Sequence, residues 1–515
     1  MTALESGRYR LCYRGGLPCS GSKERKVFPM TEATSQPAPL KLVICGGGPS
    51  AILLLQSLKQ RTRRPIDVTI LEPRSRLGVG VAYSTDCPTH LLNTRACNMS
   101  ITDDPDDFVR WLKTERPRRV LNWTREDFAP RSYFADYLQA RLADIRATGN
   151  LKISWAHSTA DSVIPTDAGW EVIPAQGDAI SADVVVLATG NEPPRVLGEG
   201  LPPSVQQLIV EDPWDVEQKA EIPKDAPVLL AGTSLTAVDI VTELIHKGHS
   251  AQIVAVSRRG LLPRSHGPIA AASEGVVHAL PSSLREVVRY VRKLGENDPR
   301  GEKWRRVFTE LRSIAPSLWR SWSVQERRRF LRHVRPFWDA HRHRLAPRVH
   351  AKIERALATG QLQIERGRIT SIEANPDGAG LRVSVRHGKR TRFFVVGRIV
   401  NCTGPEAHPG RTSNPLLQGL IADGIARPDS LGLGLAVDTD SRVISANGSA
   451  HSSLYAVGSL TRGTRWEITA IPELREQANG VVRKFLHDHA ERPALEVTIP
   501  GWAAGLQFQT TSVTR

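Results

Sequence analysis

The stretch Leu42-Val43-Ile44-Cys45-Gly46-Gly47-Gly48-Pro49-Ser50-Ala51 joins an apolar run directly to a cluster of small residues. Such a run is typical of a buried strand, and the glycines after it permit a tight turn into a helix and a close approach of the backbone to a phosphate. A second apolar run, Val68–Leu71, ends in Glu72, which lies 26 residues after Gly46. An acid in this place accepts hydrogen bonds from ribose hydroxyls, so the segment predicts a dinucleotide-binding βαβ unit.

A degenerate copy of the same pattern lies in the middle of the chain. The apolar run Val228–Leu230 leads into Gly232-Thr233-Ser234-Leu235-Thr236-Ala237, and the run Ile253–Val256 leads into Ser257-Arg258-Arg259. Arg258 lies 26 residues after Gly232, in the place that Glu72 holds in the first unit. An arginine there pairs with a 2′-phosphate, which an acid would repel. The two units together therefore predict FAD in the first and NADPH in the second.

The pattern predicts an α/β fold with two dinucleotide-binding, Rossmann-like domains. The buried run Val184–Leu187 ends in the turn Ala188-Thr189-Gly190, where we expect the chain to leave the first domain. A second run and turn, Ile399–Gly404, echoes it, and we interpret it as the return into the first domain. The predicted boundaries are a disordered extension at 1–38, an FAD-binding domain at 39–195, an NADPH-binding domain at 222–395 with a helical insertion at about 282–345, the rest of the FAD-binding domain at 396–490 and a tail at 491–515.

The composition is typical of a globular enzyme with more than one domain. The chain has 515 residues, of which 40% are hydrophobic and 24% charged, and this length allows large cores. No apolar run approaches the ~20 residues that span a bilayer, and the N-terminus lacks the apolar segment of a secretory signal. None of the six cysteines forms a CxxC pair, which disfavours a disulfide framework, a zinc site and a redox-disulfide mechanism. We therefore expect a cytoplasmic protein with no membrane partner and no metal.

The formal net charge is +16. Nucleic-acid binding is disfavoured, because the basic residues form no aromatic-interleaved stripe and no nucleic-acid motif, and we expect no such partner. The excess charge either attracts an anionic cofactor and substrate or lies on solvated faces, and the sequence leaves both explanations open. It also leaves the oligomeric state open.

These segments together resemble a bacterial family of FAD/NAD(P)-binding proteins related to class B flavin-dependent, N-hydroxylating monooxygenases. The resemblance extends from about Leu40 to Leu486 and implies bound FAD, NADPH and O2 as co-substrate. Within this neighbourhood are enzymes that hydroxylate the nitrogen of amino acids, including aspartate N-oxygenases that make nitrosuccinate. Besides the two glycine motifs, it rests on Gly80–Tyr83, His90–Asn93, Asp103–Phe108, Pro130-Arg131, Ser257–Arg264, Arg342–Arg344 and Trp466–Ala470.

One branch of these monooxygenases is disfavoured. Baeyer–Villiger enzymes carry a histidine four residues before a Trp-Pro or Trp-Asp pair. Here Val210 holds that place before Trp214-Asp215, which argues against ketone oxygenation.

The residues expected to bind the cofactors follow from the glycine motifs and from the resemblance. A helix entered at Pro472 should point its N-terminus at the pyrimidine edge of the flavin, where negative charge builds on reduction. For FAD we predict Gly46, Gly47, Gly48, Pro49, Ser50, Glu72, Asn93, Met99, Gly190, Gly458 and Pro472. For NADPH we predict Gly232, Thr233, Ser234, Leu235, Ser257, Arg258 and Arg259.

Four residues are candidates for the chemistry, each with a structural alternative. Asn93 either hydrogen-bonds the flavin or its peroxide, or is a turn residue that bonds local backbone. Arg342 and Arg344 either grip a substrate carboxylate, or lie on a solvated helix face or contact NADPH phosphate. His266 either lies near the nicotinamide or is a structural turn histidine. The tryptophans at 304, 319, 322 and 338 are expected to pack the helical insertion.

The sequence thus predicts an FAD-dependent, NADPH-consuming monooxygenase that oxygenates the nitrogen of an amino acid or small polar amine through a C4a-peroxyflavin. Its substrate would be a small anionic or amine-bearing molecule, with aspartate-to-nitrosuccinate chemistry as one form. The alternative is an NAD(P)H-dependent flavin reductase or electron-transfer protein without oxygen insertion. A redox-sensing binding protein with no turnover is a third class.

Overall fold

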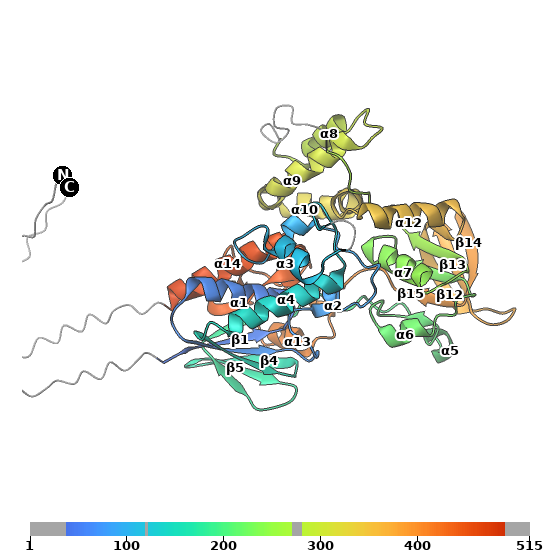
Figure 1. Cartoon of the computed structure of the whole chain (residues 1–515). Helices are drawn as coiled ribbons and strands as arrows, with labels where there is room; N and C mark the ends of the chain where they lie inside the picture. The colour runs from blue at the N-terminus through green and yellow to red at the C-terminus, as the bar shows by residue number, and fades with distance from the viewer. Residues whose placement is uncertain (1–37, 119–121, 270–280, 490–515) are drawn as a thin grey trace, which may run out of the picture. The chain divides into compact units, whose positions relative to one another are not determined.

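The computed structural model describes residues 38–118, 122–269 and 281–489. The predicted extension at 1–38, apart from its last residue, and the predicted tail at 491–515 lie outside these residues. Outside the insertion described below, the helices are α1 Pro49–Arg61, α2 Gly80–Tyr83, α3 Asp107–Glu115, α4 Arg131–Arg146, α5 Pro203–Gln206, α6 Val216–Ala220, α7 Leu235–His246, α12 Pro347–Ala358, α13 Pro415–Ala422 and α14 Ile471–Asp488 (Figure 1).

The first sheet has the strand order β16-β17-β7-β1-β2-β3. In that order the strands are Arg442–Ile444, Ala450–Ala456, Val184–Leu187, Leu40–Cys45, Ile66–Leu71 and Leu151–Ala156. The strand order reverses at β1, which pairs in parallel with β2 on one side and with β7 on the other. Ligands of α/β sheets bind at the carboxyl ends of the strands at such a point. Gly46 follows β1 at that end, as the motif predicts.

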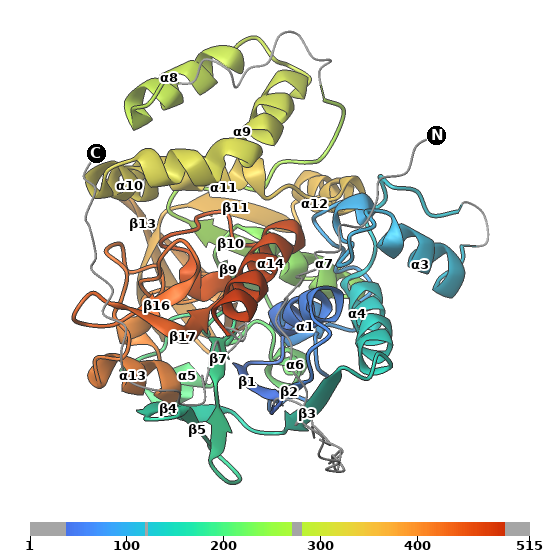
Figure 2. The same cartoon turned by 90° about the vertical axis from the view of Figure 1, so that its left-hand side faces the viewer.

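Both faces of this sheet are buried, because the side chains of β1 alternate between two cores. Leu42 and Ile44 face a core with α1, α4 and α14. Val43 and Cys45 face a second core with α13 and a small antiparallel sheet of β4 Ala160–Thr166, β5 Gly169–Pro174 and β6 Ile180–Ala182. Figure 2 shows α14, α1 and α4 side by side, with β4 and β5 on the other side of the first sheet.

The second sheet repeats this plan with the order β11-β10-β9-β15-β8. Its strands, all parallel, are Leu362–Arg366, Ile253–Ser257, Val228–Ala231, Arg398–Val400 and Ile209–Val210. Val228 and Leu230 of β9 face α7 and α12, whereas Leu229 faces the antiparallel sheet β12 Arg368–Ala374, β13 Leu381–His387 and β14 Arg390–Val396. The prediction of two Rossmann-like units is therefore confirmed.

The position of β15 corrects one interpretation. We expected Ile399–Gly404 to return into the first domain, but β15 pairs with β9 and β8 in the second sheet. The segment is the counterpart of Val184–Gly190, because each strand lies parallel to the strand before a glycine motif. Each ends in a turn whose glycine has a positive φ, +83° at Gly190 and +87° at Gly404. The similarity of the two segments reflects the same architecture in both domains. The second sheet extends beyond 222–395 at both ends.

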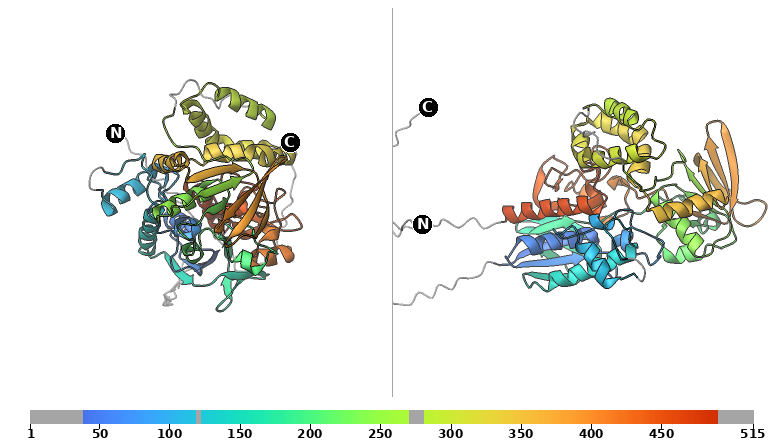
Figure 3. Two further views of the ribbon diagram at one scale, coloured as in Figure 1. Left: turned by 90° about the vertical axis from the view of Figure 1, so that its right-hand side faces the viewer. Right: turned by 45° about the horizontal axis from the view of Figure 1, so that its top comes forward.

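The stretch expected to form a helical insertion contains α8 Leu284–Leu294, α9 Glu302–Ser321, α10 Val324–Arg329 and α11 Arg335–Arg342. Figures 1 and 3 show these helices (yellow) gathered together, apart from the two sheets. Trp319, Trp322 and Trp338 form their core, as predicted, and Trp466 of the late segment joins it. The indole of Trp319 donates to the carbonyl oxygen of Gly463 at 2.8 Å, so the insertion is fixed to the segment before α14.

A buried ionic cluster joins the second domain to the first. Arg131, at the start of α4, pairs with Asp239 of α7 at 2.7 Å, and the ring of His90 lies 3.1 Å from the carbonyl oxygen of Asp239. One turn further along α7, Glu243 accepts hydrogen bonds from Lys219 at 2.8 Å and from Lys247 at 2.7 Å. Helix α7, which begins at the second glycine motif, is therefore held against the first domain through its own side chains.

Within the described ranges no helix is both long and apolar enough to cross a membrane. The same residues contain no group of three or more histidine, cysteine or acidic side chains that could hold a metal ion.

Glu243→Ala should destabilise the protein by about 3–5 kcal/mol, because it leaves the buried ammonium of Lys219 without a carboxylate. The matched control is Lys247→Ala, which removes a partner whose side chain is 47% exposed and should cost about 0–1 kcal/mol. Urea denaturation of both variants measures the difference. Equal costs would show that the buried pair of Lys219 with Glu243 contributes no more than an exposed pair.

Candidate active site

The first glycine motif is shaped partly by the fold and partly for a ligand. Gly46 has a φ of +114°, and a Cβ there would lie 2.3 Å from the carbonyl oxygen of Ala188. Only glycine therefore fits between β1 and the turn after β7. Gly48 is different, because the nearest atom to its Cβ would be 3.8 Å away and its φ of −73° is open to any residue. The space in front of Gly48 is open, as a pyrophosphate needs.

The surroundings of that space also suit a dinucleotide. Glu72 at the end of β2 is buried, and its carboxylate accepts hydrogen bonds from the backbone N–H of Gly47 at 2.9 Å and from Arg74. No side chain caps the N-terminus of α1 at Gly48, so the positive end of that helix is free for an anion. Gly458 lies beside Ser50, since a Cβ on Gly458 would lie 3.4 Å from the Ser50 hydroxyl. These residues fit FAD.

The second motif has the same construction. A Cβ on Gly232 would lie 2.2 Å from the carbonyl oxygen of Cys402, much as a Cβ on Gly46 would lie 2.3 Å from that of Ala188. No side chain caps the N-terminus of α7 at Ser234. The Thr233 hydroxyl lies within hydrogen-bond distance of the Ser257 hydroxyl and of the carbonyl oxygen of Leu261, at 2.8 and 2.6 Å. These contacts tie the glycine turn to the end of β10, where Arg258 is exposed.

A cavity of about 1470 Å³ lies between these elements, and both domains contribute to its wall. The first domain supplies Asn93 and the segment Thr469-Ala470. Ala470 precedes α14, which begins at Ile471 with Pro472 in its first turn, so the N-terminus of this helix reaches the cavity. The predicted residues that line the wall are Asn93, Gly232, Thr233, Ser234, Leu235, Ser257, Arg258, Arg259 and Arg342.

Other predicted residues lie elsewhere. Gly190 lines a small neighbouring cavity of about 20 Å³, and the side chain of Met99 is buried in the core of the first domain. Gly458 donates its backbone N–H to the amide oxygen of Gln477 on α14 at 2.9 Å, which joins the last strand of the first sheet to that helix.

His266 holds two parts of the chain together and is not on the cavity wall. Its Nε2 lies 2.9 Å from the carbonyl oxygen of Asn93, which can only accept, so Nε2 donates. The ring packs 4.8 Å from that of Phe128, and burial lowers the pKa of His266 to about 4. His266 is thus a neutral histidine that fixes the backbone of Asn93, and its catalytic role near the nicotinamide stays a prediction. Asn93 itself lines the cavity, and its side-chain oxygen accepts a hydrogen bond from the Thr94 hydroxyl at 3.4 Å.

The two arginines predicted as a carboxylate clamp are used for other contacts. Arg342 lines the cavity, but its guanidinium donates to buried Glu467 at 2.7 Å. Arg344 lies off the cavity wall and donates to the carbonyl oxygens of His341 and Arg305 at 3.0 and 2.9 Å. Burial lowers the pKa of Arg344 to about 10. Of the pair, therefore, only Arg342 lines the cavity, whereas Arg344 contacts helix α9 of the insertion.

The structure brings forward an arginine that the sequence analysis missed. Arg462 lines the cavity next to Arg335, and its guanidinium has no ion-pair or hydrogen-bond partner among the described residues. Burial, together with the charge of Arg335, lowers the pKa of Arg462. The segment Thr461-Arg462-Gly463-Thr464-Arg465 matches no motif that would single out Arg462. The other arginine in this segment, Arg465, donates to the carbonyl oxygen of Thr439.

Two further titratable groups on this wall have shifted pKa values. Burial and the charge of Arg342 lower the pKa of His343 to about 3, and burial raises the pKa of Asp339. His343 and Asp339 lie 3.8 Å apart, and Asp339 also pairs with Arg335 at 3.3 Å. The wall formed by α11 and Arg462 thus carries more positive than negative charge.

A family model described as FAD-NAD(P)-binding matches residues 43–192. Residues 43–192 thus form a domain of the FAD/NAD(P)-binding kind. This agrees with the cradle at Gly46–Ser50, which lies within the matched range. A comparison with curated protein sequences gives no match.

Solved structures match most of the chain at low identity. An ornithine N-hydroxylase from Kutzneria sp. 744, in a structure with reduced FAD, NADP⁺ and L-ornithine, has a TM-score of 0.58 at 16% identity, covering 88% of this chain and all of its own. L-Lysine 6-monooxygenase from Pseudomonas syringae has a TM-score of 0.57 at 18% identity, over 87% and 99%. The cadaverine monooxygenase of Erwinia amylovora has a TM-score of 0.57 at 13% identity, over 91% and 99%. The fold is that of flavoprotein monooxygenases with two dinucleotide-binding domains.

Gly48→Val should abolish FAD binding and leave the fold intact, because its side chain would fill the space of the pyrophosphate, while its Cβ would come no closer than 3.8 Å to a protein atom. Gly46→Val is the matched comparison and should prevent folding, since its Cβ would overlap the Ala188 carbonyl. Flavin content after reconstitution and thermal melting of the flavin-free protein measure the two effects. A Gly48→Val protein that still binds FAD would place the pyrophosphate elsewhere.

Proposed function

We propose that this protein is an FAD-dependent, NADPH-consuming monooxygenase that oxygenates the nitrogen of a small amine carrying a carboxylate. The observation that carries the proposal is that residues of both domains, including the second glycine motif and the N-terminus of α14, surround a single cavity. When bound, FAD would take electrons from NADPH and use them to activate O2 for transfer of one oxygen atom. The family model, the fold and the paired cradles support these cofactors.

The chain's own residues prepare the reaction in two ways. The N-terminus of α14 places its partial positive charge at the cavity, where it would stabilise negative charge on the flavin pyrimidine edge. His266 fixes the backbone of Asn93, so that the Asn93 amide is held on the wall for a hydrogen bond to the flavin or to the reacting oxygen. The helical insertion adds Trp338, whose indole donates at 2.8 Å to Glu467, the carboxylate that also pairs with Arg342.

The charge on the wall favours an anionic substrate. Three solved structures of similar fold are hydroxylases of ornithine, lysine and cadaverine, all amines. In this chain the cavity carries unpaired Arg462, and Arg335 lies beside it. An arginine holds a carboxylate with two parallel hydrogen bonds. We propose Arg462 as the carboxylate anchor, and an amino dicarboxylate of the aspartate type as the substrate class.

The same charge assists the chemistry. A nitrogen atom attacks an electrophilic oxygen only through its lone pair, so the amine must reach the site without its extra proton. Positive neighbours disfavour an ammonium group and therefore favour the neutral amine once the carboxylate is held. An amino dicarboxylate keeps its attraction to the wall in this form, whereas a diamine does not.

The test of the function is a screen of amino acids for substrate-dependent NADPH oxidation by the FAD-loaded protein. A monooxygenase should release little peroxide with its substrate and form hydroxylamine or a more oxidised product in proportion to the NADPH consumed. Aspartate and glutamate should stimulate oxidation more than ornithine and lysine. NADPH oxidation matched by peroxide with every amine would overturn the proposal and favour the flavin reductase.

Arg462→Ala should raise KM for the substrate by about tenfold to a hundredfold, since a charge-assisted hydrogen bond contributes ~1.5–3 kcal/mol. Flavin reduction by NADPH in the absence of substrate should keep its rate, because Arg462 holds neither nucleotide in this proposal. Arg329→Ala, an exposed arginine of the insertion, is the control and should change neither value. An unchanged KM in Arg462→Ala would remove Arg462 from the substrate site and leave the N-oxygenase proposal standing.

A further inference from the structure

Two arginines of the small antiparallel sheet lie directly opposite one another. Arg368, near the start of β12, is the cross-strand partner of Arg386 on β13. Both side chains are exposed, and no carboxylate pairs with either among the described residues. Glu365, on the adjoining strand β11, pairs with Arg392 instead. Like charges directly opposite on neighbouring strands destabilise a sheet, so this pair costs stability unless an anion lies between or beside it.

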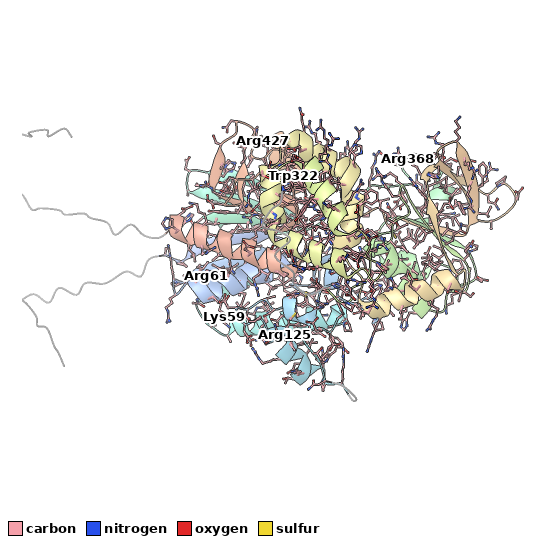
Figure 4. The ribbon with its side chains drawn as sticks, turned by 90° about the horizontal axis from the view of Figure 1, so that it is seen from above. Lys59, Arg61, Arg125, Trp322, Arg368 and Arg427 are labelled. Carbon is pink, nitrogen blue, oxygen red and sulfur yellow. The ribbon has the colours of Figure 1, made fainter. Side chains whose placement is uncertain are left out.

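The pair lies next to the end of β10. The backbone N–H of Gly367 donates to the carbonyl oxygen of Ser257 at 2.9 Å, which places Arg368 beside the turn that carries Arg258. A Cβ on Gly260, in the same turn, would lie 3.3 Å from the Cβ of Arg366. Figure 4 labels Arg368 at this sheet.

The same cavity connects these residues to the second glycine motif. Its wall includes Thr233 and Ser257 as well as Arg258, Arg368 and Arg386. A dinucleotide whose pyrophosphate lies at the N-terminus of α7 places the adenosine ribose at the end of β10. Three unpaired arginines from two different sheets therefore surround the region beyond that ribose.

We propose that Arg368 and Arg386 complete, with Arg258, the binding site for the 2′-phosphate of NADPH. The inference rests on the proposed use of NADPH and adds two residues that no glycine motif includes. A phosphate monoester carries a charge of about −1.5 to −2 at neutral pH and accepts several hydrogen bonds from arginine. Its binding offsets the repulsion between the two arginines. The relief of this repulsion therefore contributes to the binding free energy of NADPH but not to that of NADH.

This arrangement has two consequences of opposite sign. Arg386→Gln should weaken NADP⁺ binding about tenfold and leave NAD⁺ binding unchanged, since only NADP⁺ carries the 2′-phosphate. The same substitution should raise the melting temperature of the ligand-free protein, because it removes one of two like charges. If Arg386 were needed only for the fold, its substitution would lower both the affinity for NADP⁺ and the melting temperature.

The experiment uses the FAD-loaded protein with calorimetric titrations of NADP⁺ and NAD⁺, without turnover. The variants are Arg368→Gln, Arg386→Gln, the double variant and Arg258→Ala as the reference loss. Arg382→Gln is the control, because Arg382 lies on the same strand but pairs with Glu373 at 3.1 Å and is not on the cavity wall. In the ligand-free protein the second of the two glutamine substitutions should add no further stabilisation, which a double-mutant cycle measures.

Thermal shifts with 2′,5′-ADP, 5′-AMP and inorganic phosphate identify the ligand. We expect 2′,5′-ADP to stabilise the wild type most and to lose that advantage in Arg386→Gln. Equal stabilisation by inorganic phosphate would reveal a general anion site and overturn the inference. Equal losses of NADP⁺ and NAD⁺ affinity would also overturn it. So would single-stranded nucleic acid that binds the protein more tightly than NADP⁺ does. These binding results do not depend on the oxygenation product, so failure here leaves the amino-acid screen as a separate test of function.

Discussion

The close approach of two strands at each nucleotide site is the constraint on which this structure depends. A Cβ atom on Gly46 would lie 2.3 Å from the carbonyl oxygen of Ala188, and a Cβ atom on Gly232 would lie 2.2 Å from that of Cys402. No residue with a side chain fits at either position. Both contacts occur where the strand order of a sheet reverses between parallel strands. The turn must be tight there so that the next helix starts directly at the ligand. The open space at Gly48 and the uncapped starts of α1 and α7 follow from this geometry.

Two sites on separate sheets become one site only if the sheets are held in place. The contacts of Arg131 and His90 with Asp239 hold α7 against the first domain, and the ion pair of Lys219 with Glu243 holds α6 against α7. The indole of Trp319 fixes the helical insertion to the segment before α14. Buried ion pairs need good geometry to offset desolvation, and therefore favour one arrangement of the domains over others.

Arginines on and around the cavity differ in what they are free to do. Arg342 is neutralised by Glu467, and Arg344 donates to backbone carbonyl oxygens. Arg462, Arg258, Arg368 and Arg386 have no carboxylate partner among the described residues and line the cavity. A guanidinium that is already paired within the protein helps to form the cavity wall, whereas one without a carboxylate partner can bind an anionic ligand. The net charge of +16 therefore bears on function through only a few of the chain's basic residues.

The sequence by itself determined the two nucleotide units, because their signal is local: an apolar strand, glycines, a helix start and a charged residue at a fixed distance. It also indicated that the tryptophans of the insertion pack together. Local signals failed where two distant segments share a pattern. Ile399–Gly404 repeats the turn at Gly190, and only the pairing of β15 with β9 assigned it to the second domain.

Tertiary structure alone decided which arginine, histidine and acid face the cavity. Arg342 and Arg344 are two residues apart, yet one reaches the wall and the other supports the insertion, and Arg462 comes from a segment with no motif. The cross-strand pairing of Arg368 with Arg386 depends on the register of a sheet. Whether a charge is free depends on partners hundreds of residues away along the chain, and no spacing rule records them. Sequence spacing encodes the backbone turns at a nucleotide, whereas folding decides which side chains remain available to bind it.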